Sequence, residues 1–237
     1  MIRALIMLGF WALSILIVGP PLVLWAWLTG NVNPLYYISA TLAKWGVLVA
    51  GVKIERRGLE NLQPGQNYIV MANHSSNLDP PVLIPSVPGR CSVLVKKEVF
   101  RIPILGTGMR LAQLVAVDRS DRDAAIESVH NAVKVLRQGL HMLVYPEGTR
   151  SSDGRLLPFK KGPFHLAMES GVPVLPVTLL GTYECWPKTR FALRPGTVTV
   201  VFHPPIDPHD YTDRDSLQKA VSNAIGSALP PERREGR

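Results

Sequence analysis

A histidine and an aspartate stand five positions apart in the stretch MANHSSNLDPP, residues 71–81. The stretch follows an apolar run, YIVMA, and ends in a double proline, which is typical of the start of a helix. A carboxylate on one ring nitrogen of His74 would fix the tautomer and leave the other nitrogen free to take a proton. A chain that needs Asp79 only as a helix cap would show the same spacing. The pair alone therefore leaves a catalytic and a purely structural interpretation open.

Two further polar loops follow apolar, strand-like runs. The run HMLVYP (141–146) leads into EGTRSSDGR (147–155), and the run AQLVAV (112–117) leads into a polar segment around Arg119. Arginine suits a phosphate because its planar fork donates two hydrogen bonds and keeps its charge. Ligands of open α/β sheets bind at the carboxyl ends of strands, so we expect these loops to share one site. Lys96 and Lys97 end another such run and add cations.

From residue 52 onward, apolar and β-rich runs alternate with amphipathic helical patterns. This alternation predicts an α/β domain over residues 52–229, with a mixed, largely parallel sheet flanked by helices. Asp121 and Gly139 are expected to cap the start and the end of the first long helix. Residues 230–237 are predicted to form a disordered tail. The expected strands are 66–72, 91–96, 112–117, 141–146, 172–179 and 197–202, and the expected helices are 122–139, 162–171 and 216–229.

The start of the chain is apolar, with no charged side chain between Arg3 and Lys44. As one helix, residues 4–28 would exceed the ~30 Å hydrocarbon core of a bilayer, but a double proline interrupts them. A second apolar segment follows at 35–51. Trp and Tyr cluster around the turn between the two segments, as they do at membrane–water interfaces.

Three interpretations of residues 1–51 compete. A cleaved signal peptide is disfavoured, because the apolar run is too long and no small-residue cleavage site follows it. A single span would carry the α/β domain to the side opposite the N-terminus, whereas two connected segments, spanning or dipping into one leaflet, would return it to the same side. Because Arg3 favours a cytoplasmic N-terminus, the sequence predicts a two-helix anchor in the inner (cytoplasmic) membrane, with the α/β domain facing the cytoplasm.

Composition narrows the class of partner. The 237 residues carry a formal net charge of +8, so anionic partners are expected. Two cysteines form neither a disulfide framework nor a metal-ligand cluster, and no metal site is expected. Nucleic-acid binding is disfavoured, because 46% hydrophobic residues and the apolar start explain the charge better as a basic, lipid-facing surface.

Four segments, NHSSNLD, VDRS, YPEGTRS and VPVLPV, stand in the order and approximate spacing of the four motif blocks of the glycerolipid acyltransferases. From about residue 50 to 205 the chain resembles this family, and most closely the bacterial 1-acyl-sn-glycerol-3-phosphate (lysophosphatidate) acyltransferases. The resemblance implies transfer of a fatty acyl group from a thioester, acyl-CoA or acyl carrier protein, to the sn-2 hydroxyl of lysophosphatidate, giving phosphatidic acid. It implies no cofactor.

The resemblance also implies roles for single residues. His74 would be the general base and Asp79 would orient it, with no covalent acyl-enzyme, which agrees with the absence of a Gly-x-Ser-x-Gly motif. The fourth block, around Pro176, would be structural or face the acyl chain. The substrate-binding residues would be Arg119, Glu147, Gly148, Thr149 and Arg150, with Lys96 or Lys97 as candidates for contact with the oxyanion or the phosphate.

Other functions stay open on the sequence alone. The motifs report the chemistry more than the acceptor, so an acyltransferase acting on another lysolipid, such as lyso-ornithine lipid, would carry the same segments. A non-catalytic membrane-lipid binding protein would not need the His74–Asp79 pair. A lipid hydrolase would be expected to carry a serine nucleophile motif.

Overall fold

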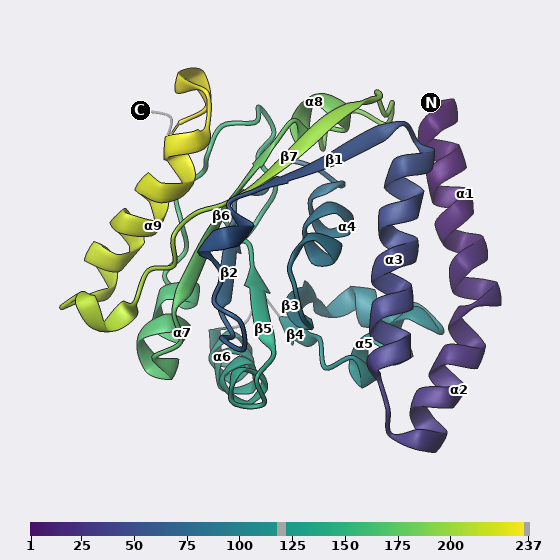
Figure 1. The fold of residues 1–237 in the computed structure, drawn as a ribbon, viewed down its shortest axis with the longest axis horizontal. Helices are drawn as coiled ribbons and strands as arrows, with labels where there is room; N and C mark the ends of the chain where they lie inside the picture. The colour runs from purple at the N-terminus through teal and green to yellow at the C-terminus, as the bar shows by residue number, and fades with distance from the viewer. Residues whose placement is uncertain (118–121, 235–237) are drawn as a thin grey trace.

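The computed structural model describes residues 1–117 and 122–234, the side chains of 122–126 excepted (Figure 1). Its centre is a seven-stranded sheet in the order β1-β7-β6-β2-β5-β3-β4. Neighbouring strands run parallel except β6 and β7, so the predicted mixed, largely parallel sheet is confirmed. The strands are β1 (Val52–Arg57), β2 (Ile69–Ala72), β3 (Cys91–Lys96), β4 (Val115–Val117), β5 (His141–Val144), β6 (Val174–Leu180) and β7 (Gly196–Phe202).

Helices cover both faces of the sheet, and each face has its own hydrophobic core. Strand β2 serves both cores, because successive side chains of a strand point to opposite faces. Val70 and Ala72 belong to one core, and Ile69 and Met71 to the other. One face carries α6 (Arg122–Arg137), α7 (Gly162–Ser170) and α9 (Arg214–Ala228), and the other carries α4 (Asp79–Leu83), α5 (Leu105–Leu111) and the N-terminal helices.

Strand β1 and helix α5 were not predicted. The sequence of β1, VKIERR, alternates only weakly, and most of its side chains are exposed because it is an edge strand. Charged side chains on an edge strand discourage pairing with another chain. The predicted end of α6 at Gly139 is confirmed by its positive φ of 80°, while Asp121 lies outside the described residues.

The C-terminal segment is more ordered than predicted up to residue 234. Residues Pro231–Arg233 form a 3₁₀ turn, and the Leu156 N–H donates to the Arg233 carbonyl at 2.9 Å. The Arg233 side chain pairs with Glu184 at 2.7 Å. Glu184 belongs to the short helix α8 (Thr182–Cys185). These contacts tie the segment to the carboxyl edge of the sheet.

The N-terminal segment forms three helices, where the sequence predicts two: α1 (Ile2–Ile17), α2 (Gly19–Thr29) and α3 (Asn33–Val49). The double proline lies in the first turn of α2, where the missing N–H groups cost no hydrogen bond. Among the helices described, none is by itself long and apolar enough to cross a membrane. The α1–α2 pair, bent by 41°, could do so by length and composition.

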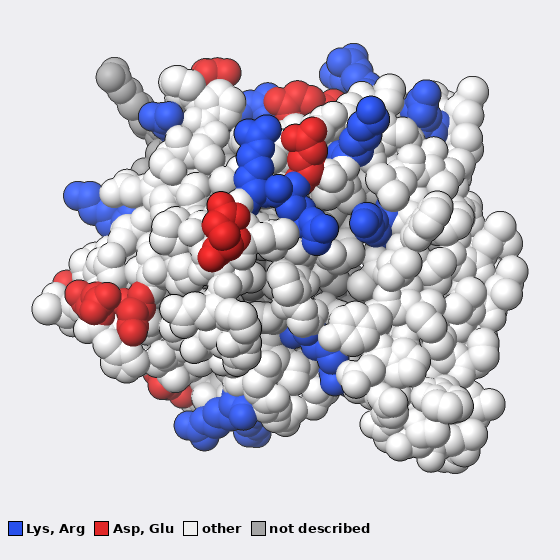
Figure 2. Space-filling view, in the orientation of Figure 1, with Lys and Arg blue, Asp and Glu red and all other residues white. Residues whose placement is uncertain are grey.

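These three helices pack on the α/β domain with one face only. The Trp11 indole donates to Ala43 O at 3.3 Å and joins α1 to α3, and the Cys91 N–H donates to the Tyr36 hydroxyl at 2.8 Å and joins α3 to β3. Figure 2 shows that the opposite face, on the right, is nearly free of charge. Its exposed apolar side chains include Leu5, Leu13, Leu16, Ile17, Leu24, Trp25, Trp27, Leu28 and Trp45.

Candidate active site

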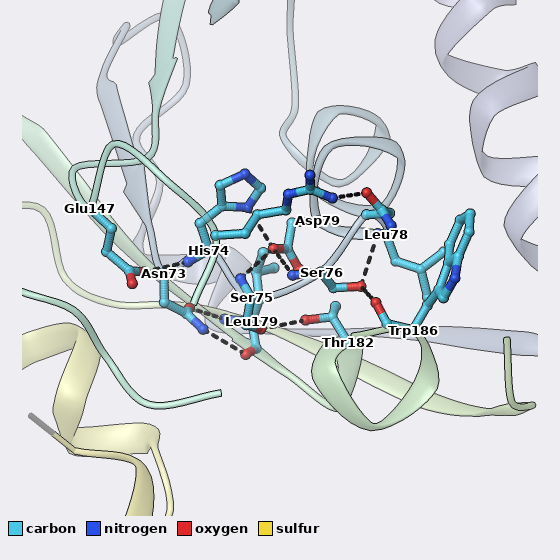
Figure 3. A network of polar contacts seen from close by, with 12 residues as sticks. Asn73, His74, Ser75, Ser76, Leu78, Asp79, Glu147, Leu179, Thr182 and Trp186 are labelled. Carbon is cyan, nitrogen blue, oxygen red and sulfur yellow. Dashed lines mark hydrogen bonds and ion pairs between the residues drawn. The ribbon is translucent and has the colours of Figure 1, made fainter. Parts of the chain in front are cut away.

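The predicted pair of His74 and Asp79 meets in the structure (Figure 3). His74 lies just beyond the carboxyl end of β2, and Asp79 is the first residue of α4. The His74 Nδ1 and Asp79 Oδ2 atoms are 2.7 Å apart. The Asp79 side chain is fully buried, while the His74 side chain keeps 14% of its surface exposed. No group in the described part of the chain bonds to His74 Nε2, so this nitrogen is available to a substrate.

The Asp79 carboxylate does not cap the helix, so the structural role that the sequence left open for it is wrong. Leu78 is the N-cap, and Asp79 Oδ2 instead accepts the backbone N–H groups of Ser75 and Ser76, each at 2.8 Å. Pro80 and Pro81 have no N–H for a capping carboxylate to accept, and the next N–H, that of Val82, donates to Leu78 O at 3.0 Å. One carboxylate oxygen therefore holds both the imidazole and the loop that carries it.

A tyrosine forms one wall of the site. The Tyr145 ring, just after β5, stacks on the His74 ring with a centroid distance of 4.0 Å and an interplanar angle of 18°. Burial, and then the negative charge of Asp79, raise the pKa of Tyr145 well above its ordinary value. Tyr145 therefore stays neutral and restricts the rotation of the imidazole.

Glu147 joins the histidine loop to the loop after β5. Its Oε1 accepts the His74 N–H at 2.5 Å, and its Oε2 accepts the Leu157 N–H at 3.0 Å. The residue is only 2% exposed. Burial raises the pKa of Glu147 to about 8, against the two N–H donors that lower it, and the Asp79 charge raises it as well. Because each oxygen accepts a backbone N–H, this geometry fits a positioning role, while the predicted contact with substrate stays a prediction.

The remainder of the EGTR segment lies against the loop that carries His74. Gly148 has a φ of 71°, in the left-handed region that favours glycine, and its N–H donates to Tyr145 O at 3.0 Å. Thr149 is exposed. The Arg150 guanidinium donates to the Asn77 side chain, and the Ser151 N–H donates to His74 O at 2.8 Å. The segment thus places Arg150 directly beside the loop of residues 73–79, which carries His74.

The two lysines lie further along the same edge of the sheet. Strand β3, which ends at Lys96, is two positions from β2 in the sheet, or roughly 10 Å at ~4.8 Å per strand. Lys96 is exposed and pairs with Glu98 at 3.5 Å, and Lys97 is exposed beside it. Arg119, predicted at the end of the neighbouring β4, lies outside the described residues. The lysines therefore lie about two strand spacings from the His74 loop, and their contact with the oxyanion or the phosphate stays a prediction.

Two residues of the site, Asn73 and Ser76, were given no role by the sequence analysis. The Asn73 amide donates to Leu179 O at 3.0 Å and accepts the Leu179 N–H at 2.7 Å, which ties the loop to β6. The Ser76 hydroxyl donates to Trp186 O at 2.6 Å, beyond α8. In the part of the chain described, no group of three or more His, Cys, Asp or Glu could hold a metal ion.

A cavity of about 450 Å³ opens beside the pair, between the N-terminal helices, α5 and the sheet. Pro80 and Pro81, which directly follow Asp79, form part of its wall. Most of the other lining side chains are apolar and include Trp11, Leu22, Tyr36, Ile84, Leu105 and Met109. The site therefore joins a polar edge, which carries the histidine and the cations, to a deep apolar pocket.

Comparison with known proteins supports an acyl-transfer site. The family model described as "Acyltransferase" matches residues 53–180. A 1-acyl-sn-glycerol-3-phosphate acyltransferase of Limnanthes alba is 38% identical over 224 residues, which cover 93% of this chain and 76% of the relative. The alpha form from Homo sapiens is 32% identical over 166 residues, which cover 70% of this chain and 59% of the relative.

A solved structure extends the similarity to the whole fold. The crystal structure of the 1-acyl-sn-glycerophosphate (LPA) acyltransferase from Thermotoga maritima matches with a TM-score of 0.82 and 28% identity. The match covers 94% of this chain and 92% of that one. The family match spans the segments that carry His74, Asp79 and Glu147. This chain therefore belongs to the glycerolipid acyltransferase family.

Proposed function

We propose that this acyltransferase moves a fatty acyl group from an acyl thioester to the sn-2 hydroxyl of 1-acyl-sn-glycerol-3-phosphate, forming phosphatidic acid. The observation that carries the proposal is the His74–Asp79 pair, in which a buried carboxylate lies 2.7 Å from one nitrogen of a partly exposed imidazole. The names of the relatives from Limnanthes alba, Homo sapiens and Thermotoga maritima support lysophosphatidate as the acceptor.

In the proposed mechanism His74 Nε2 takes the proton of the acceptor hydroxyl while its oxygen attacks the thioester carbonyl. The tetrahedral oxyanion then collapses, the carbon–sulfur bond breaks, and the imidazolium returns the proton to the leaving thiolate. Asp79 holds the tautomer and stabilises the imidazolium. Because the hydroxyl attacks directly, no acyl-enzyme forms. The donor is acyl-CoA or an acyl carrier protein, and either would deliver its thioester from the cytosol.

The phosphate of the acceptor would lie against Arg150, with Lys96, Lys97 and Arg119 as further cations of the same edge. The Arg150→Lys variant keeps the charge but loses the bidentate fork. We expect its KM for lysophosphatidate to rise about tenfold with little change in kcat, because the lost contact is equal in the ground and transition states. Arg155→Lys is the matched control, since Arg155 is 56% exposed and lies near Asp153. A rise in KM for the thioester alone would assign Arg150 to the donor.

The apolar cavity would hold an acyl chain of one substrate. A Cβ atom added to Gly108 would lie 3.8 Å from Leu35 Cδ1 and 3.9 Å from Val23 Cγ2, so alanine fits and a longer side chain must enter the cavity. We expect Gly108→Leu to lower kcat/KM for long acyl chains about tenfold relative to short ones, since each excluded CH₂ forfeits ~0.8 kcal/mol of burial. Gly108→Ala is the control. An equal loss for all chain lengths would contradict this use of the cavity.

The N-terminal helices would hold the enzyme at the inner membrane with its site on the cytoplasmic side. Their outer face is apolar, whereas their inner face packs along the α/β domain. A helix packed in this way on a charged domain cannot cross the bilayer without carrying that domain into the hydrocarbon. We therefore favour insertion into one leaflet, which brings the site to the depth of the acceptor hydroxyl.

A panel of acceptors tests the proposed function. Purified full-length protein is given an acyl thioester with lysophosphatidate, other lysophospholipids or lyso-ornithine lipid, and the released thiol is measured. The proposal expects turnover with lysophosphatidate above all others. Preference for lyso-ornithine lipid would keep the chemistry and change the acceptor, and binding of lipid without thiol release would indicate a non-catalytic lipid-binding protein.

A further inference from the structure

The segment between α8 and β7 carries a cluster of exposed side chains that the proposed mechanism does not use. We call residues 187–195 the basic loop. Lys188, Arg190 and Arg194 are exposed, and Phe191 among them is 51% exposed. An exposed aromatic side chain forgoes the free energy of burial, and Phe191 has cations on both sides of it along the loop.

The cations of the basic loop have no partner among the described residues. No hydrogen bond or ion pair joins the side chains of Lys188, Arg190 or Arg194 to that part of the chain, whereas Arg214 and Arg233 elsewhere pair with acidic neighbours. Unpaired cations next to an exposed aromatic ring are the composition that anionic lipid headgroups attract.

The backbone of the loop is held in place. The Arg194 N–H donates to Cys185 O at 2.8 Å, and the Arg190 N–H donates to Pro187 O at 3.2 Å. Trp186 before the loop and Leu193 within it are buried in the core that the N-terminal helices share. The exposed side chains are therefore presented on an anchored turn.

The loop also adjoins the apolar face of the N-terminal helices. The Gly196 N–H donates to Gly51 O at 3.3 Å, and both Arg3 and Pro195 lie against Gly51. Figure 1 shows the chain that enters β7 close to the first turn of α1. Arg3 is the first charged side chain at this end of the apolar face. The basic loop therefore lies at the border between the apolar face and the charged surface.

We propose that the basic loop is a second membrane contact, which binds the anionic headgroups of the lipid surface beside the inserted N-terminal helices. This rests on the membrane association in the proposed function. The contact would also set the depth of the catalytic loop, because Ser76 donates to Trp186 O at 2.6 Å and pairs with Pro187 in an isolated bridge. The same Ser76 donates its N–H to Asp79.

A label on the loop tests the contact without relying on the helices. Both native cysteines, Cys91 and Cys185, are buried, so Phe191→Cys in the full-length chain can be labelled selectively with an environment-sensitive dye. We expect the emission to shift to the blue, and to be quenched by brominated lipid, on vesicles that contain phosphatidylglycerol. Met168→Cys on α7, also an exposed apolar position, is the matched control and should show neither change.

Charge removal gives a second, functional readout. The Lys188→Gln/Arg190→Gln variant should raise KM for lysophosphatidate in anionic vesicles about tenfold to thirtyfold, the effect of losing two surface charges near anionic lipid. It should leave turnover of a water-soluble, short-chain lysophosphatidate unchanged. Lys134→Gln/Arg137→Gln on α6 removes the same charge from exposed positions elsewhere and should behave like the wild type.

The outcomes separate the two proposals. If the wild type does not bind vesicles at all, membrane association itself is wrong, whatever the loop does. If it binds and turns over lysophosphatidate while the Phe191 label stays in water, the basic loop is not a membrane contact. A KM increase confined to an acyl-carrier-protein donor, with unchanged vesicle kinetics, would also overturn the proposal and assign the loop to an acidic protein.

Discussion

Replacement of His74 by alanine is expected to lower the rate of acyl transfer by about 10²–10⁴-fold, the usual contribution of a general base. The substitution removes the nitrogen that the proposed mechanism assigns to the hydroxyl proton, while the backbone contacts of the loop to Glu147 and Ser151 do not require the ring. Asp79→Asn should be similarly severe, because an amide neither fixes the tautomer nor stabilises the imidazolium.

Single-turnover kinetics at saturating acceptor would measure this loss, with the melting temperature and vesicle binding recorded alongside. His130→Ala is the matched control, since His130 is exposed on α6 and far from the loop in sequence. Near-wild-type turnover by a folded, vesicle-bound His74→Ala protein would refute His74 as the base. Asp79→Asn also replaces the charged oxygen that accepts two backbone N–H groups with a weaker amide acceptor, so only His74→Ala decides the point.

The second large effect concerns Glu147, which we place as a positioning residue. Both oxygens of a carboxyl group keep a lone pair that can accept a hydrogen bond even when the group is protonated, whereas the amide nitrogen of Glu147→Gln accepts none. Either the His74 or the Leu157 N–H then loses its partner. Because a misplacement of about 1 Å can cost ~10²-fold in rate, we expect kcat to fall about 100-fold while KM for lysophosphatidate changes little. A rise in KM alone would instead support the substrate contact predicted from the sequence.

The pH dependence of stability distinguishes this role from a surface charge. The pKa of Glu147 is about 8 in the folded protein against an ordinary value of 4.5, so the folded state holds a proton that the unfolded chain has released. The free energy of unfolding should therefore decrease as pH rises from about 4.5 to about 8. Glu147→Gln should flatten this slope in urea unfolding curves. Glu169→Gln, at an exposed position of α7, should leave the slope unchanged.

Much of the catalytic centre follows from short-range sequence patterns. His74 and Asp79 are five residues apart, and a polar turn of that length can fold only a few ways between a strand and a proline-started helix. The apolar runs that became β2 and β5 are buried on both faces, and β3 is buried over its first three residues, so their near-continuous hydrophobicity marked them clearly. Parallel strands in turn placed the loops after β2 and β5 at one edge.

The N-terminal helices show where periodicity stops being informative. Residues 2–49 are apolar nearly all round, so the sequence alone could not say which face would pack on the domain and which would be left exposed. That choice depended on particular partners, such as the hydroxyl of Tyr36 meeting the backbone of Cys91. Edge strand β1 was missed for a related reason, since its exposed charged residues carry no signal of burial.

Only the tertiary structure decided the role of each side chain around the histidine. Glu147 lies 73 residues from His74, and Asn73 lies 106 residues from Leu179, so no local pattern links either pair. The turn of Asp79 back into its own loop depended on two prolines that offer no N–H and on the Val82 N–H, which donates to Leu78 O, and both are details of backbone geometry. The sequence determined which groups are candidates for the chemistry, and long-range hydrogen bonds between buried polar groups determined how those groups are arranged, because such bonds form only once the chain has folded.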